Sequence, residues 1–114
     1  MPNVYTNYKA VLTTSELTTL YTVGSETTAI IKLLRATNID EENDCKIRAF
    51  IVDTDSVSYT LETNRNIQKG TSEELFNSYS FSTSPVVLKE SEVLKVQAEN
   101  GGDLHMILSV LEIT

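Results

Sequence analysis

Alternation of apolar and polar residues runs through most of this chain, and it is the feature that most restricts the fold. Stretches with a period of two extend from Val4 to Ile113, and short clusters of Thr, Ser, Asn, Asp or Gly end each of them. A period of two places successive side chains on opposite faces of a pleated strand. The pattern therefore predicts an all-β protein.

The alternating stretches predict about eight short strands. The clearest of them cover residues 4–12, 17–23, 28–38, 45–53, 57–63, 92–98 and 104–113. Short strands separated by turns about every ten residues are typical of a sandwich or a barrel. We therefore expect an antiparallel two-sheet β-sandwich of jelly-roll character. The length of 114 residues fits one domain, so this sandwich should cover residues 1–114 as a single unit.

Three segments leave more room for interpretation. The run 29–34 is apolar on both faces, which predicts a central strand or a protein interface; helix is the alternative, but the β-branched residues favour strand. Residues 67–71 suggest a short strand that ends at the Gly70 turn, and 72–76 form either another strand or one helical turn. The polar residues 53–56 predict a hairpin turn, and the Asn100-Gly101 step predicts another between the last two strands.

The charge distribution excludes several partners. The net charge is −7, and the nine basic residues are scattered along the chain. A scattered set forms no stripe that could follow a phosphate backbone, so we expect no nucleic-acid binding. The apolar runs are far shorter than the roughly 20 residues that cross a bilayer, so we expect no membrane partner either. The first residues lack a secretory signal, which predicts synthesis in the cytoplasm.

No set of residues assembles a catalytic site or a cofactor site. His105 is the one histidine and Cys45 the one cysteine, so an internal disulfide is excluded and the usual zinc ligands are not available. We expect His105 to be an ordinary strand residue and Cys45 a small core residue, although the two could in principle pair. Calcium could bind if the acidic segments 40–44 and 53–55 met at one end of the fold, but neither matches a calcium-binding loop. Solvated loops are the preferred interpretation, with no cofactor and no enzymatic activity.

Partner contacts are predicted for aromatic and apolar residues outside the regular core pattern. Val4, Tyr5 and Tyr8 belong to the first strand, and Phe76, Tyr79 and Phe81 precede Pro85. Such residues are either interface anchors or a lid over an open end of the sandwich. The arm formed by residues 1–3 could also add to the sheet edge of a neighbouring protein.

With the strands placed, the chain resembles small virion structural proteins of tailed bacteriophages, notably those that infect marine cyanobacteria. The resemblance extends almost from end to end and is carried by the segments NVYTNYKAVLTT (3–14), LTTLYTV (17–23), TTAIIKLLRATN (27–38), VLKESEVLKVQA (87–98) and SVLEIT (109–114). The chain departs from the pattern at residues 23–26, where a Pro-containing turn is expected, and in the longer, more polar loop 40–44. Both departures bear on which partner is met and not on the fold.

The resemblance implies a non-enzymatic part of a virus particle that forms homo-oligomers and contacts other virion proteins. A capsid decoration (cement) protein, bound to the major capsid protein and stabilising the head shell, is the leading expectation. A tail, neck, collar or fibre-associated protein is the alternative. A carbohydrate-binding β-sandwich module is a third hypothesis, against which the absence of Trp argues.

Overall fold

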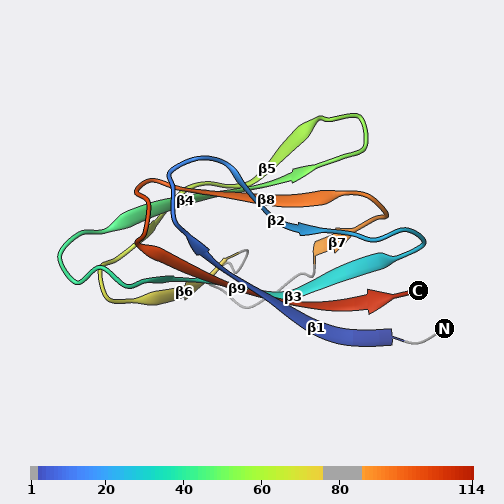
Figure 1. Cartoon of the computed structure of the whole chain (residues 1–114), viewed down its shortest axis with the longest axis horizontal. Coiled ribbons are helices and arrows are strands. Elements are labelled where there is room, and N and C mark those ends of the chain that lie inside the picture. The colour runs from blue at the N-terminus through green and yellow to red at the C-terminus, as the bar shows by residue number, and fades with distance from the viewer. Residues whose placement is uncertain (1–2, 76–85) are drawn as a thin grey trace.

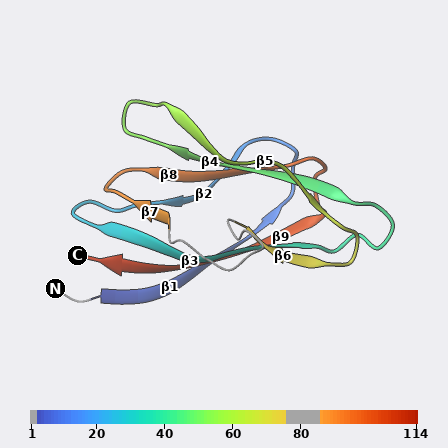
Figure 2. The ribbon, with the colours of Figure 1, turned by 180° about the vertical axis from the view of Figure 1, so that it is seen from behind.

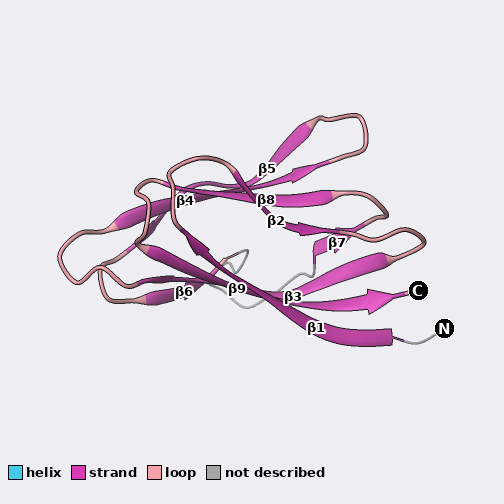
Figure 3. Ribbon diagram, in the orientation of Figure 1, coloured by secondary structure: helices cyan, strands magenta, loops and turns pink. Residues whose placement is uncertain are grey.

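A computed structural model of the chain describes residues 3–75 and 86–114. These residues form nine strands in two packed antiparallel sheets (Figures 1 and 3). Sheet A contains β1 (Asn3–Leu12), β9 (Leu104–Ile113) and β3 (Thr28–Asn38), with β6 (Ser72–Glu74) and β7 (Val86–Leu88) both paired to β3. Sheet B contains, in spatial order, β2 (Thr18–Thr22), β8 (Val93–Ala98), β4 (Cys45–Val52) and β5 (Ser58–Ile67). The predicted all-β sandwich is confirmed.

The order of pairing follows a rolled-up hairpin. The first strand β1 pairs with the last strand β9, β2 pairs with β8, β3 pairs with β6 and β7, and β4 pairs with β5. Successive pairs alternate between the two sheets, which is the jelly-roll arrangement. Seen from behind, the same two layers remain separate, with β4, β5 and β8 in one and β1, β3 and β9 in the other (Figure 2).

The core fills the space between the two sheets. Alternate side chains of β9 are almost completely buried, namely Leu104, Met106, Leu108 and Val110. Their counterparts from sheet B are Cys45, Ile47 and Ala49 of β4 and Leu94, Val96 and Ala98 of β8. Burying one such large aliphatic side chain stabilises the fold by about 1.5–3 kcal/mol. The period-two pattern of the sequence therefore reports correctly which faces point inward.

The apolar run of β3 occupies a central position. β3 has the predicted bounds and pairs with β9 on one side and with β6 and β7 on the other. Ile31 is buried, whereas Leu33, beyond a register shift in the pairing with β9, is only half-buried on the outer face. A strand with neighbours on both sides can carry apolar residues on both faces because one face is core and the other is shielded by adjacent side chains.

The structure corrects one local prediction, decides between two alternatives at another segment, and adds one strand. Residues 67–71 do not form a strand of their own, because β5 continues to Ile67 and Gly70 adopts a positive φ of 67° in the following turn. Of the two alternatives for residues 72–76, the strand is confirmed over residues 72–74, which form β6. The short strand β7, directly after Pro85, was not predicted.

The Asn100-Gly101 step does not close a hairpin. The strands β8 and β9 that flank it belong to different sheets, so the segment carries the chain across the sandwich. A Cβ atom on Gly101 would lie 2.6 Å from the carbonyl oxygen of Thr13, so only glycine allows this approach. The hairpin predicted at residues 53–56 is confirmed, since β4 and β5 pair directly around it.

A β-bulge changes the inward pattern of β2. The pairing of β2 with β8 shifts between Thr19 and Tyr21, which leaves Leu20 as the extra residue. Both Leu20 and Tyr21 are consequently buried, although they are neighbours in sequence. This bulge turns the Tyr21 side chain into the sandwich.

Among the described residues there is no helix long and apolar enough to cross a lipid bilayer.

Candidate interaction surfaces

The predicted contact residues of β1 lie near the ends of the chain. Tyr5 is 72% exposed and points away from the core, and Val4 is 49% exposed. Residue 3 of β1 lies opposite Ile113 of β9, so Val4 and Tyr5 are beside the C-terminal strand (Figure 1). Phe76, Tyr79 and Phe81 lie outside the described residues.

Tyr8 points to the opposite side, into the sandwich. Its ring contacts that of Tyr21 with centroids 4.8 Å apart, and its hydroxyl donates a 3.3 Å hydrogen bond to the Glu112 carboxylate. Tyr21 donates a second hydrogen bond, of 2.5 Å, to the same carboxylate oxygen. Burial, the negative charge of Glu112 and the hydrogen bond to it together raise the pKa of the Tyr8 hydroxyl. The same causes, burial first, raise the pKa of Tyr21.

An apolar row crosses the outer face of sheet A. Register places Tyr5 of β1 opposite Leu111 of β9, Leu111 opposite Ile30 of β3, and Ile30 opposite Val87 of β7. We call these four residues the apolar row. Tyr5 and Val87 are exposed, and the two central members are half-buried. Four adjacent apolar side chains on a solvent-facing sheet form a surface that can be buried against another protein.

His105 and Cys45 do not meet. His105 is exposed on the outer face of sheet A, opposite Val11, whereas Cys45 is fully buried in sheet B. Burial raises the pKa of the Cys45 thiol, which keeps it in the unreactive protonated form. Cys45 is therefore the small core residue that the sequence predicts, and His105 is a strand residue.

The two acidic segments lie at opposite ends of β4, because residues 40–44 precede that strand and residues 53–55 follow it. Asp40 accepts hydrogen bonds from the backbone amides of Glu42 at 2.8 Å and Asn43 at 3.3 Å, and these bonds lower the pKa of its carboxyl. Asp53 accepts backbone hydrogen bonds within its own turn. No group of three or more His, Cys, Asp or Glu residues in the described part of the chain is arranged to hold a metal ion.

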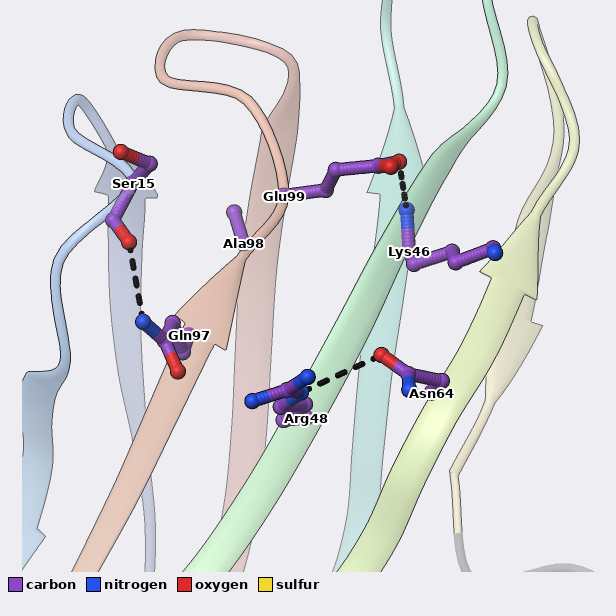
Figure 4. Close-up of a pocket in the computed structure, with 7 residues that line it drawn as sticks. All are labelled: Ser15, Lys46, Arg48, Asn64, Gln97, Ala98 and Glu99. Atoms are coloured by element: carbon purple, nitrogen blue, oxygen red, sulfur yellow. Dashed lines mark hydrogen bonds between the residues drawn. The ribbon is translucent and has the colours of Figure 1, made fainter.

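A polar pocket opens on the outer face of sheet B. It has a volume of about 500 Å³ and is lined by Ser15, Lys46, Arg48, Asn64, Gln97, Ala98 and Glu99 (Figure 4). The lining comes from β4, β5, β8, the start of the β8–β9 connection and the loop between β1 and β2. Arg48 lies at its centre, opposite Gln97 of β8 and beside Asn64 of β5.

Hydrogen bonds to the surrounding structure orient the side chains of this pocket. The Arg48 Nε donates to the Asn64 amide oxygen at 3.2 Å, and the Gln97 amide nitrogen donates to the Ser15 carbonyl oxygen at 3.1 Å. One Glu99 carboxylate oxygen accepts the backbone N–H of Lys46 at 3.1 Å. Among the described residues, no acid forms an ion pair with Lys46 or Arg48. The hydrogen bonds thus orient the side chains of Arg48, Gln97 and Glu99, while Lys46 contributes its exposed ammonium group.

The charge around this pocket opposes that of the whole chain. The four strands of sheet B contain four basic residues and one acid, a net charge of +3, whereas the chain carries −7. The one acid, Glu62, is paired with Arg65, which is the one basic residue of these strands that forms an ion pair among the described residues. Lys46, Arg48 and Lys95 therefore give this face a local positive charge, which Glu99 at the pocket lining offsets in part.

Sequence reasoning missed this pocket because its members are distant in the chain. The alternation of β4 does place Lys46 and Arg48 on one face, and this was the available signal. Gln97, Asn64 and Ser15 join them only through strand pairing, whose partners a single sequence does not reveal.

No protein-family model matches the chain, and no curated protein matches it. Its structure is similar to a chain of the T13 IBDV viral particle, with a TM-score of 0.53 and 9% identity over 96% of this chain. A chain from the Gx strain of infectious bursal disease virus has a TM-score of 0.47 and 10% identity over 96% of this chain. The present chain spans 30% and 31% of the length of these two viral chains. At 9% identity, the first similarity shows the fold alone: a β-sandwich that also occurs in an icosahedral virus particle.

Proposed function

We propose that this protein is a non-enzymatic structural component of a virus particle, and more specifically a decoration protein on the head shell of a tailed phage. The observation that carries the proposal is the rolled-hairpin strand order, in which β1 pairs with β9 at one end of the order and β4 pairs with β5 at the other. Jelly rolls of this kind build viral capsids, although they also occur in lectins and cupins. The similarity to a chain of the T13 IBDV particle supports the viral alternative.

The apolar row supplies the surface that such a role requires. A decoration protein must bind neighbouring subunits, and Tyr5 at 72% exposure offers an aromatic anchor at one end of the row. We propose that the outer face of sheet A, with Tyr5 at its edge, contacts another virion protein, and that the exposed Val4, on the opposite face of β1, extends this contact around the edge strand. A standard interface buries about 800 Å² on each partner, which one sheet face of this size can provide.

A tail, neck or fibre-associated role uses the same fold and the same apolar surface. Immunogold electron microscopy of intact virions of the encoding phage separates the two locations. Gold distributed over the head is the expected result. Gold at the neck or tail would contradict the decoration role and support the tail, neck or fibre-associated role. If the virions carry no label and mass spectrometry of purified particles lacks the chain, the virion role is wrong.

The contact surface has its own test. Particles that lack this protein are incubated with the wild-type chain or with Tyr5→Ser, and the bound fraction is measured after sedimentation. The matched control is Tyr59→Ser, because Tyr59 is 56% exposed but belongs to β5 of sheet B. We expect Tyr5→Ser to lose most binding and Tyr59→Ser to retain it. Equal loss in both variants, or in neither, would contradict the assignment of the contact to sheet A.

A further inference from the structure

We infer that the polar pocket on sheet B binds an acidic oligosaccharide, that is, a sugar chain bearing carboxylate or sulfate groups. The inference rests on three properties of the pocket: two basic side chains that form no ion pair with any acid of residues 3–75 and 86–114, the oriented amides beside them, and the positive charge of the surrounding face. A volume of about 500 Å³ lies within the usual range for small-molecule sites.

The basic residues define the charge of the ligand. Arg48 donates through Nε to Asn64, which holds the guanidinium plane in place, and its terminal nitrogens form no hydrogen bond within the described part of the chain. A guanidinium oriented in this way can bind a carboxylate or a sulfate through two parallel hydrogen bonds. Lys46 lies two residues away on the same face of β4 and adds a second positive charge. The ligand is therefore an anion with acceptor oxygens.

The remaining polar groups define the rest of the ligand. The Gln97 amide nitrogen is engaged by the Ser15 carbonyl oxygen, so its amide oxygen is the group left to accept a hydrogen bond. Glu99 uses one carboxylate oxygen on the Lys46 backbone and has a second oxygen at the rim. Acceptors beside cations suit a ligand that carries hydroxyl donors as well as an acid group, which is the composition of an acidic sugar.

An acidic peptide fits this pocket less well. Carboxylate side chains of a peptide only accept hydrogen bonds, so the acceptors of Gln97 and Glu99 would have to be met by backbone N–H groups further away, whereas a sugar carries hydroxyl donors on the same ring as its acid group. Phe50 supports a sugar in addition, because it lies two residues from Arg48 on the outer face of β4, opposite Lys95, and is half-buried. Its half-buried ring can pack against the apolar face of a sugar ring next to the pocket.

The experiment measures binding by isothermal titration calorimetry to four probes. They are an oligogalacturonate, a heparin-derived oligosaccharide, a neutral malto-oligosaccharide of equal length, and a peptide with the acidic sequence of residues 39–44. We expect binding to at least one acidic oligosaccharide and none to the neutral one. Binding of the oligogalacturonate would show that carboxylates suffice, whereas binding of the heparin oligosaccharide alone, which carries both groups, would show that sulfate is required. Absence of binding to both acidic oligosaccharides, or equally tight binding of the peptide, would overturn the inference, and the latter would favour an acidic protein partner.

Variants locate the site. Arg48→Gln is expected to raise Kd about tenfold or more, the change produced by losing a charge-assisted hydrogen bond. Asn64→Ala keeps every charge but frees the guanidinium, so we expect a smaller loss of affinity. The matched control is Lys9→Gln, which removes one exposed charge from sheet A and should leave Kd unchanged. Equal weakening in Lys9→Gln and Arg48→Gln would show non-specific attraction and would contradict the assigned pocket.

Discussion

The hydroxyl of Tyr21 on β2 donates a 2.5 Å hydrogen bond to the carboxylate of Glu112 on β9, and so joins the two sheets of the sandwich. Tyr8 on β1 donates to the same oxygen, which connects three strands at one carboxylate. The bond exists because the bulge at Leu20 turns Tyr21 inward. A single extra residue in β2 therefore determines how the end of the sandwich is held together.

Tyr21→Phe should lower the free energy of unfolding by about 1.5–3 kcal/mol, the usual contribution of a hydrogen bond to a charged group. The ring and its contact with Tyr8 remain, so the loss reports the hydroxyl alone. Urea unfolding followed by circular dichroism gives the value. Tyr5→Phe is the control, because the Tyr5 side chain is largely exposed and should show no change. A change below about 0.5 kcal/mol in Tyr21→Phe would mean that the bond does not support the fold.

The same cluster predicts a loss of stability in alkali. The pKa values of Tyr8 and Tyr21 are raised in the folded protein, whereas in the unfolded chain tyrosine titrates near its ordinary value of about 10. Above that pH the unfolded chain binds fewer protons than the folded protein, so the free energy of unfolding falls as the pH rises. The double variant Tyr8→Phe, Tyr21→Phe should show a shallower decline between pH 9 and pH 11 in urea unfolding. An equal slope in both proteins would contradict the assigned shifts.

Ile31 and Leu33, two positions apart in β3, should differ sharply in their contribution to stability. Ile31→Ala removes a buried side chain and is expected to lower the free energy of unfolding by about 2–5 kcal/mol. Leu33→Ala alters the half-buried outer face of sheet A and should cost about 1 kcal/mol or less. Urea unfolding of the two variants measures both values. Equal costs would show that the register of β3 is misassigned.

Asn38 should be the most sensitive polar residue of the β3–β4 connection. It is buried, its side-chain amide donates to the carbonyl oxygens of Asn43 and Ile67 at 3.0 Å, and its amide oxygen accepts the Asp40 N–H at 2.9 Å. Asn38→Ala leaves these backbone groups without that partner, which costs about 1–3 kcal/mol for each group that water cannot reach. Thermal unfolding measures the loss. Asn7→Ala, at an exposed site on β1, should leave the midpoint unchanged.

Local alternation was sufficient to predict most strands. β3 and β9 have the predicted bounds because their inward residues repeat every second position along most of their length. The pattern failed where pairing changes it: the bulge at Leu20 breaks the period, and β7 has three residues, too few for a period to be recognised. The Asn100-Gly101 step led to a wrong prediction of a hairpin turn. Its glycine is instead required because the backbone of Thr13, a residue about 90 positions earlier, approaches it closely.

The interaction surfaces were less accessible to sequence reasoning. The sequence predicts Tyr5 as a contact residue because it lies outside the regular core pattern. The rest of the apolar row, which consists of Leu111, Ile30 and Val87, is brought beside Tyr5 only by the register of four paired strands. Tyr8, selected for the same reason, instead lies inside the sandwich beside Tyr21. Tyr5 and Tyr8 are three positions apart, so they point to opposite faces of β1.

The pairing of Asn3 with Ile113 makes the order of the strands partly independent of where the chain begins. Because β1 and β9 run antiparallel with their outer ends side by side, a short peptide could link them without disturbing any strand pair. The linked chain would have a circular backbone, and new termini could then be introduced elsewhere, for example at the exposed turn between β4 and β5. A circular permutant of this kind would move both termini from sheet A to the β4–β5 turn of sheet B, at the same end of the sandwich, while keeping the two outer sheet faces intact (Figure 1).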